Sequence, residues 1–267
     1  MEPTLAEIIL LGIIEGLTEF LPVSSTGHLI LASEMIGWRG EASAAFKIAI
    51  QLGAILAVLV AYRQRFTGVI TGLVRRDAGA IAFTRNIILG FLPAMVVGVI
   101  AYEAIRALLE SPMVVAIALL VGGIIILALE RMVPVARHGS VEAMPARTSL
   151  LVGVGQCVAM VPGVSRSGAT IIFGLLAGLE RRTAAEYSFF LAVPTMMAAT
   201  VYALWKNRDA LGGGDLADIG IGFGVAFVVA LAVVKAFVAI VGRWGFAPFA
   251  WYRIVVGGAA IAWLLMR

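Results

Sequence analysis

The sequence predicts an all-α polytopic membrane protein with six transmembrane helices, two re-entrant helical hairpins and an inverted-topology repeat. Composition is the first observation: of 267 residues, 61% are hydrophobic and 13% are charged, with a mean hydropathy of +1.03. A soluble domain carries about 25% charged residues, so this chain could not cover a water-facing surface. The second observation is a recurrence of charge-free apolar runs, and the third is a pair of apolar segments with polar interruptions.

Six segments are long and apolar enough to cross a bilayer, which requires about 20 mostly apolar residues. Flanking Lys and Arg side chains can extend the shorter runs to the membrane interface. The predicted spans are residues 46–62, 84–102, 112–130, 186–205, 218–241 and 248–266. We interpret residues 1–267 as a single integral membrane domain with pseudo-repeats at about 1–132 and 148–267.

Two further segments are apolar but broken by polar residues. Residues 4–37 are interrupted from Glu15 to His28, and residues 148–179 are interrupted at Gln156 and from Pro162 to Thr170. Each leaves arms of roughly 12–18 residues, which are too short to cross comfortably. Irregular backbone inside a membrane is tolerated only where it is buried in protein or lines a wet cavity. Each segment therefore predicts a hairpin that enters and leaves on the same side.

The distribution of basic residues predicts the orientation. The segment 63–85 has an excess of arginine over its single Asp77, which is typical of a cytoplasmic loop. Counting spans from this loop places residues 131–147 and 242–247 on the cytoplasmic side. It places residues 103–111, 206–217 and both termini on the outer side. The N-terminus has Glu2 and Glu7 but no basic residue, so we expect no cleavable signal peptide.

An inverted repeat follows from this count. Each half is one hairpin followed by three spans, and an odd number of spans inverts the second half. The hairpins should enter from opposite faces, so that their polar breaks meet near the midplane. An ungapped offset of 141 residues pairs Gly12 with Gly153, Ser24 with Ser165 and Gly27 with Gly168.

Glu15 and Glu19 are four residues apart, so on a helix they share one face. Adjacent carboxylates repel each other and are costly to desolvate in an apolar segment. A divalent cation, a basic partner or protonation must compensate the negative charge of the pair. The alternative is a pair of helix-end carboxylates in interfacial water.

The run Ser24-Ser25-Thr26-Gly27-His28 directly follows Pro22 and Val23. Its hydroxyls can cap a helix that begins near Gly27, and such a helix N-terminus is an anion site. His28 is one of two histidines and the one that lies in an apolar segment. A lone histidine is often structural, but the neighbouring hydroxyls and carboxylates favour acid–base work.

The second break contains Arg166 between hydroxyl residues. By the predicted topology Arg166 lies inside the membrane, which makes it a functional candidate. Its guanidinium suits phosphate oxygens, and the hydroxyls of Ser165, Ser167 and Thr170 would add neutral donors. Alternatively, Arg166 only pairs with Glu15 or Glu19. The single cysteine, Cys157, is interpreted as a packed side chain.

Two carboxylates, an imidazole, an arginine and several hydroxyls together predict phosphoryl transfer or phosphate-ester hydrolysis on a lipid-linked substrate. The formal charge of +4 is modest and concentrates in loops, so we expect no nucleic-acid partner. A transporter or lipid flippase is the competing hypothesis, because inverted repeats with broken helices are its usual architecture.

Two motifs of this chain resemble the two signatures of the bacterial undecaprenyl-diphosphate phosphatases, also called the bacitracin-resistance family. They are Glu15-Gly-Leu-Thr-Glu19-Phe-Leu-Pro-Val-Ser-Ser-Thr-Gly-His28 and Pro162-Gly-Val-Ser-Arg-Ser-Gly-Ala-Thr170. The resemblance covers essentially the whole chain. It implies hydrolysis of undecaprenyl diphosphate to the monophosphate at the periplasmic face of the inner membrane. That step recycles the carrier lipid for peptidoglycan synthesis and confers bacitracin resistance. It also implies a divalent cation, Mg²⁺ or Ca²⁺.

The resemblance also implies roles for single residues. Glu15 and Glu19 would bind the metal or orient water, Ser25 and His28 would be catalytic, and Arg166 would bind the diphosphate. We expect the remaining substrate contacts from Ser24, Thr26, Gly27, Ser165, Ser167, Gly168 and Thr170. Whether Ser25 is a covalent nucleophile or His28 activates water stays open, with a preference for Ser25 assisted by His28 and a Glu. Membrane lipids surround the chain, and a homodimer is compatible with the sequence.

Overall fold

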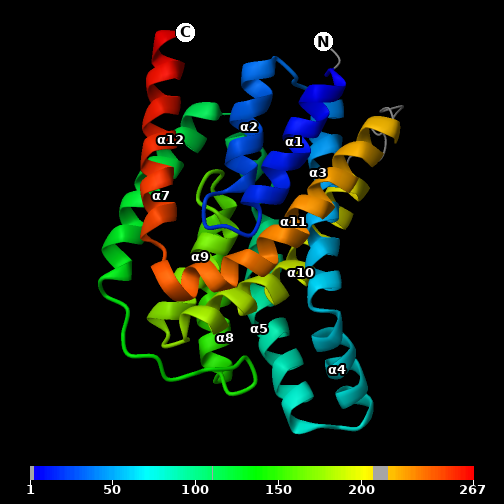
Figure 1. The fold of residues 1–267 in the computed structure, drawn as a ribbon, viewed down its shortest axis with the longest axis vertical. Coiled ribbons are helices and arrows are strands. Elements are labelled where there is room, and N and C mark those ends of the chain that lie inside the picture. The colour runs from blue at the N-terminus through cyan, green and yellow to red at the C-terminus, as the bar shows by residue number, and fades with distance from the viewer. Residues whose placement is uncertain (1–2, 110, 207–215) are drawn as a thin grey trace.

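The computed structural model describes residues 3–109, 111–206 and 216–267, and every regular element in these ranges is a helix (Figure 1). Six helices are long and apolar enough to span a membrane. They are α3 (Glu41–Ala61), α5 (Ala78–Ile100), α7 (Pro112–Glu130), α10 (Arg181–Lys206), α11 (Leu216–Trp244) and α12 (Ala247–Met266). The six predicted spans are therefore confirmed, and the protein is an all-α integral membrane protein.

The shorter helices lie between and beside these spans. They are α1 (Leu5–Thr18), α2 (Ser25–Ile36), α4 (Arg63–Val74), α6 (Tyr102–Leu109), α8 (Ala146–Gln156), a 3-10 helix (Cys157–Met160) and α9 (Arg166–Leu176). Of the connections predicted from the sequence, Glu110 and residues 207–215 lie outside the described ranges.

The arginine-rich segment 63–85 is more ordered than the predicted loop. It forms α4, a short turn at residues 75–77 and the first part of α5. Asp77 caps α5, because its carboxylate accepts a hydrogen bond of 2.8 Å from the backbone N–H of Ala80. A helix satisfies its own backbone hydrogen bonds, so charged side chains on an exposed helix do not oppose it. The prediction of a loop here was wrong.

Each broken segment is a pair of short helices joined by an irregular turn. In the first, α1 begins at a capping box between Thr4 and Glu7, and α2 ends at Gly37 with a φ of 72°. In the second, α8 continues into the 3-10 helix before the chain turns into α9. The re-entrant course of these hairpins and the inverted repeat stay predictions.

The two turns share one local geometry. Ser24 and Ser165 both have positive φ, at 70° and 80°, and both are helix N-caps. Each accepts a hydrogen bond from the glycine three residues on, Gly27 at 3.3 Å and Gly168 at 3.0 Å. Positive φ is uncommon for a residue with a Cβ, so this match at an offset of 141 residues is specific.

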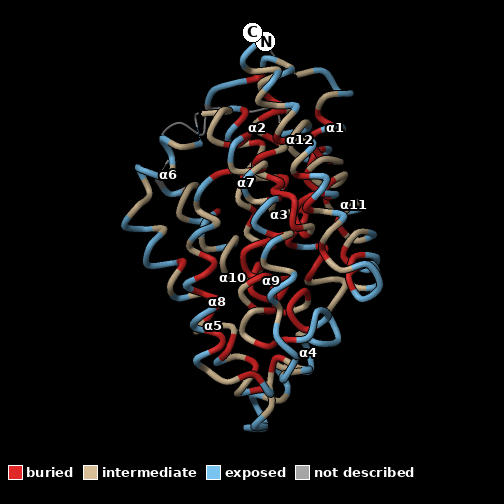
Figure 2. The backbone as a smooth tube through the Cα atoms, turned by 90° about the vertical axis from the view of Figure 1, so that its left-hand side faces the viewer, coloured by how far each residue is buried: buried red, intermediate tan, exposed pale blue. Residues whose placement is uncertain are grey.

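The helices enclose the two turns. Helix α11 packs along α1 and α3, α12 packs along α7, and α5 packs against α8. Both termini lie at one end of the molecule, while α4 and the start of α5 lie at the other (Figure 1). Figure 2 shows the buried backbone concentrated in the interior. Outward apolar side chains such as Val228 on α11 and Val255 on α12 are 64% and 67% exposed, as suits a lipid-facing surface.

Candidate active site

An ion pair joins the two turns inside the protein. The Nη2 of Arg166, at the start of α9, donates to Oε1 of Glu19, just after α1, at 2.9 Å. The Ser25 hydroxyl donates to the other carboxylate oxygen, Oε2. Ser167 adds a second link, because its hydroxyl donates to the Leu21 carbonyl at 2.7 Å. The carboxylate and hydroxyl of the first turn and the guanidinium of the second thus form one connected group.

Arg166 has a second set of partners on α10. Its Nη1 donates to the carbonyl of Ser188 at 2.8 Å and lies 3.2 Å from the Ser188 hydroxyl. The Thr170 hydroxyl donates to the Ser188 hydroxyl at 2.8 Å. The Nε of Arg166 is buried and has no hydrogen-bond partner within the described ranges, so one donor of the fork is free. Sequence reasoning missed Ser188, since a serine inside an apolar span carries little signal.

Glu15 lies one turn before Glu19 and is fully buried. Neither of its carboxylate oxygens has a hydrogen-bond partner in the part of the chain that the structure describes. An uncompensated buried carboxylate is costly, and all-oxygen donor sets suit Mg²⁺ and Ca²⁺. Glu15 with Glu19 therefore fits such a cation. Among the described residues no group of three His, Cys, Asp or Glu side chains could hold a metal.

Most of the other predicted substrate contacts surround this group. Ser24, Ser165 and Ser167 are buried, and the hydroxyls of Ser165 and Ser167 lie 3.0 Å apart. Gly27 brings the first turn against the second, because a Cβ built there would lie 3.4 Å from the Cα of Gly163. Thr26 is half-buried in the first turn of α2. The two turns thus bring their hydroxyls and helix N-termini together, as an anion site requires.

His28 makes contacts other than those expected from the sequence. Its Nδ1 lies 2.8 Å from the Ser24 carbonyl and its Nε2 lies 2.9 Å from the Tyr252 hydroxyl. The carbonyl can only accept, so Nδ1 carries the proton and Nε2 accepts from Tyr252. The two rings are stacked with centroids 5.5 Å apart. Glu19, and not His28, is the hydrogen-bond acceptor of Ser25.

Arg253 is a further residue of the site that the sequence reasoning overlooked. It is fully buried on α12 and its guanidinium donates to backbone carbonyls of three segments. The acceptors are Pro22 at 3.1 Å, Gly163 at 2.9 Å, Val164 at 2.7 Å, Ala118 at 3.1 Å and Leu119 at 3.4 Å. One side chain thereby ties both turns to α7. The sequence does contain a signal for this residue. Arg253 is the one charged residue in the predicted span 248–266, and a charged residue inside a span is a functional candidate.

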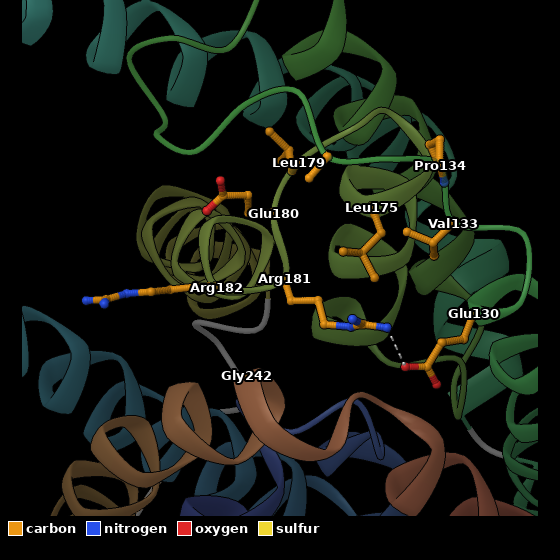
Figure 3. Close-up of a pocket in the computed structure, with 10 residues that line it drawn as sticks. Glu130, Val133, Pro134, Leu175, Leu179, Glu180, Arg181, Arg182 and Gly242 are labelled. Atoms are coloured by element: carbon orange, nitrogen blue, oxygen red, sulfur yellow. Dashed lines mark ion pairs between the residues drawn. The ribbon is translucent and has the colours of Figure 1, made fainter.

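A surface pocket of about 460 Å³ lies apart from this group, beside the end of α7 and the start of α10 (Figure 3). Glu130 and Arg181 face each other across it, with 3.6 Å between Oε1 and Nη2. The Glu130 carboxylate also accepts from the Phe246 N–H at 2.8 Å. None of the residues that line this pocket belongs to the predicted site.

Comparison with known proteins gives a consistent result. A family model described as bacitracin resistance protein BacA matches residues 8–259. A protein named undecaprenyl-diphosphatase from Sphingopyxis alaskensis is 74% identical over 263 residues, which are 98% of this chain and 99% of that protein. Proteins of the same name from Rhizorhabdus wittichii and Novosphingobium aromaticivorans are 59% and 53% identical. These two alignments cover 100% and 99% of both chains.

Proposed function

Since the chain belongs to the bacitracin resistance protein BacA family, we propose that it hydrolyses undecaprenyl diphosphate to undecaprenyl phosphate and inorganic phosphate. The observation that carries this function is the connected group of Arg166, Glu19 and Ser25 at the junction of the two turns. In this group the anion-binding guanidinium of Arg166 is connected through a carboxylate, a candidate base, to a hydroxyl, a candidate nucleophile. The apolar surface of the molecule suits a lipid substrate. The reaction returns the carrier lipid to peptidoglycan synthesis and supports bacitracin resistance.

We assign Arg166 to binding of the diphosphate. Its Nη atoms are fixed by Glu19 and Ser188, while the buried Nε stays available to a phosphate oxygen. Charge-assisted hydrogen bonds of this kind are about twice as strong as neutral ones. The N-termini of α2 and α9, with their serine caps, add positive potential at the same place.

Ser25 is the nucleophile in the mechanism that these contacts favour. Its oxygen attacks the terminal phosphorus, and its hydroxyl proton passes to Glu19, which already accepts that hydrogen bond. The bond between the terminal phosphorus and the bridging oxygen breaks, and undecaprenyl phosphate leaves. Water then attacks the phosphoserine, which releases inorganic phosphate and restores the Ser25 hydroxyl.

Direct attack by water is the second mechanism, and His28 supports it. The lone pair of Nε2 accepts from Tyr252, so a water that displaced the Tyr252 hydroxyl could be deprotonated there. The two mechanisms differ in whether Ser25 is essential, and this difference makes them separable by mutation.

We propose that Glu15 and Glu19 hold a divalent cation, Mg²⁺ or Ca²⁺. The unpartnered, fully buried carboxylate of Glu15 supports this assignment. When bound, such a cation neutralises the charge that the diphosphate brings and stabilises the developing charge on the phosphoryl oxygens.

The enzyme is proposed to lie in the bacterial inner membrane with its site open to the periplasm. Both termini lie at the end of the molecule opposite the arginine-rich α4 (Figure 1), which agrees with the orientation predicted from charge. The homodimer stays a prediction.

Phosphate release from a prenyl diphosphate tests the function directly. We expect purified protein in detergent to release inorganic phosphate, and we expect Arg166→Ala to abolish the release. Arg131→Ala is the matched control, because Arg131 is exposed and remote from the site. A transporter or flippase would instead move the lipid between leaflets without releasing phosphate, and that result would overturn the proposal.

A further inference from the structure

A second surface pocket, of about 400 Å³, lies at the N-terminal end of α8. It is formed where the connection after α7 passes the start of α8 and the end of α9. The residues that line it are Arg137, His138, Arg147, Thr148, Leu151 and Ala177. None of them belongs to the active site, so the pocket needs a separate explanation.

The formal charges that line this pocket are those of two arginines, Arg137 and Arg147. Arg137, His138 and Arg147 make no ion pair within the described ranges, and no acidic residue lines the pocket. The carboxylate of Glu142 is paired with Arg65, and that of Glu180, which lies beside Gly139, borders the other pocket. The pocket of Figure 3 differs in this respect, because there Arg181 is paired with Glu130. A concave site lined by arginine side chains and by no carboxylate attracts an anion.

The backbone around the pocket is held in place. The N–H groups of Arg137 and His138 both donate to the Gly178 carbonyl, at 2.8 and 3.1 Å, and the Glu180 N–H donates to the His138 carbonyl at 3.1 Å. Pro145 precedes α8 and offers no side-chain acceptor to the first N–H groups of that helix. The positive end of α8 therefore adds to the basic side chains.

The apolar side of the pocket continues into the surface that faces lipid. Leu151 follows Arg147 by one helical turn and is 46% exposed. Leu150 and Val154 beside it are 46% and 55% exposed. The basic groups thus lie at the N-terminal end of an exposed apolar face of α8. This arrangement is complementary to a lipid that has an anionic headgroup and acyl chains. Basic pockets of this kind beside membrane helices bind anionic lipid headgroups.

We propose that this pocket binds the phosphate headgroup of an anionic phospholipid, with the acyl chains lying along α8. Arg137, Arg147 and the N-terminus of α8 hold the phosphate, and Leu151 contacts the first part of a chain. This site is distinct from the catalytic one, and lipid binding there does not require hydrolysis.

Native mass spectrometry of the full chain tests the proposal. The protein is released from mixed micelles that contain phosphatidylglycerol or phosphatidylcholine, and bound lipid is counted over a concentration series. We expect the double variant Arg137→Gln, Arg147→Gln to lower the apparent affinity for phosphatidylglycerol by roughly 30-fold, since each of the two basic groups near an anionic surface contributes about 1 kcal/mol. Binding of phosphatidylcholine should not change.

The matched control is Arg63→Gln, Arg75→Gln, which removes the same charge from exposed positions on and just after α4. An equal loss of affinity for phosphatidylglycerol in both double variants would show that the lipid is attracted by charge without a specific site. That result would overturn the proposal. A third arm adds inorganic phosphate at millimolar concentration. Displacement of the lipid by phosphate alone, with no dependence on acyl chains, would identify a free-anion site and contradict the lipid assignment.

Discussion

At the scale of single residues, the two oxygens of Glu19 have different partners. One accepts from Arg166 and the other accepts from Ser25, so the same carboxylate orients the substrate-binding cation and the nucleophile. Glu15, one turn earlier, has no such partners among the described residues. The two carboxylates are thus unequal, although the sequence presents them as a symmetrical pair.

Removing the Ser25 hydroxyl should separate the two mechanisms. We expect Ser25→Ala to lower kcat by about 10³-fold or more, because loss of a nucleophile in an enzyme typically costs that much. Ser33→Ala is the control, since Ser33 is buried on the same helix and its hydroxyl has no partner within the described ranges. Phosphate-release kinetics give the measurement. A Ser25→Ala enzyme that keeps most of its kcat would favour attack by water at His28.

Neutralising Glu15 tests the cation site. Glu15→Gln keeps the shape but removes the charge, so the concentration of Mg²⁺ or Ca²⁺ that gives half-maximal activity should rise by about tenfold or more. Thermal stability in the presence of a chelator should be unchanged or higher, because an unpaired buried carboxylate is lost. Activity titrations and melting curves measure the two effects. An unchanged metal dependence would remove Glu15 from the site.

Arg253 is expected to position both turns. Arg253→Met leaves the carbonyls of Pro22, Gly163 and Val164 without their donor, and each buried group left unsatisfied should cost about 1–3 kcal/mol of stability. Arg253→Lys restores the charge but not the fork of donors, so we expect partial recovery of stability together with a raised KM. Melting curves and steady-state kinetics measure this. A lysine variant with wild-type KM would show that only the charge matters.

At the scale of elements, close packing of helices depends on glycine at two equivalent places. Gly12 sets α1 against α11, where a Cβ would lie 2.8 Å from the Gly222 carbonyl oxygen. Gly153 sets α8 against α5, where a Cβ would lie 2.5 Å from the Gly90 carbonyl oxygen. Small residues let membrane helices approach closely. These contacts hold the helix that precedes each turn, α1 and α8, close to a spanning helix.

Adding one methyl group at these contacts should loosen the bundle. We expect Gly12→Ala and Gly153→Ala each to destabilise the protein by about 1–3 kcal/mol, because a backbone oxygen cannot move aside. Gly224→Ala is the control, since a Cβ there meets nothing within 4 Å, and alanine favours a helix. Thermal melting in detergent is the measurement. Three equal melting temperatures would contradict the packing described here.

At the scale of the whole molecule, the predicted orientation rests on the distribution of basic residues. The termini lie at one end and α4 with its arginines at the other, with the site between them (Figure 1). If the two helical hairpins return to the side of entry, as the sequence predicts, the six spanning helices alone set the topology. This arrangement is what allows two turns distant in sequence to meet in the interior.

Accessibility to an impermeant thiol reagent measures that orientation. In a Cys157→Ser background, we expect Arg75→Cys in the turn after α4 to react only after cells are permeabilised. Arg267→Cys at the other end should react in intact spheroplasts, because positive charge favours the cytoplasmic side. Labelling of position 75 from outside would overturn the predicted orientation.

Much of the fold and part of the site could be predicted from the sequence, because those signals are local. Apolar runs of about 20 residues identify spanning helices in any tertiary context. The polar interruptions around Glu19 and Arg166 located both turns, and the pairing of Arg166 with a glutamate was among the alternatives. The helix in segment 63–74 was missed, because charge patterns report the membrane side and not the backbone conformation.

The sequence by itself determined the spanning helices, the two turns and the residues that gather there. Only the tertiary structure decided which atoms meet: Ser25 with Glu19, His28 with Tyr252, and Arg253 with five carbonyls. The physical reason is that hydropathy and helix capping act over a few neighbouring residues, whereas the hydrogen bonds of His28 and Arg253 join segments far apart in the chain, and the bond from Ser25 to Glu19 depends on how the turn between them folds. Every residue also carries a carbonyl, so nothing in a sequence marks the one that a buried arginine will bind.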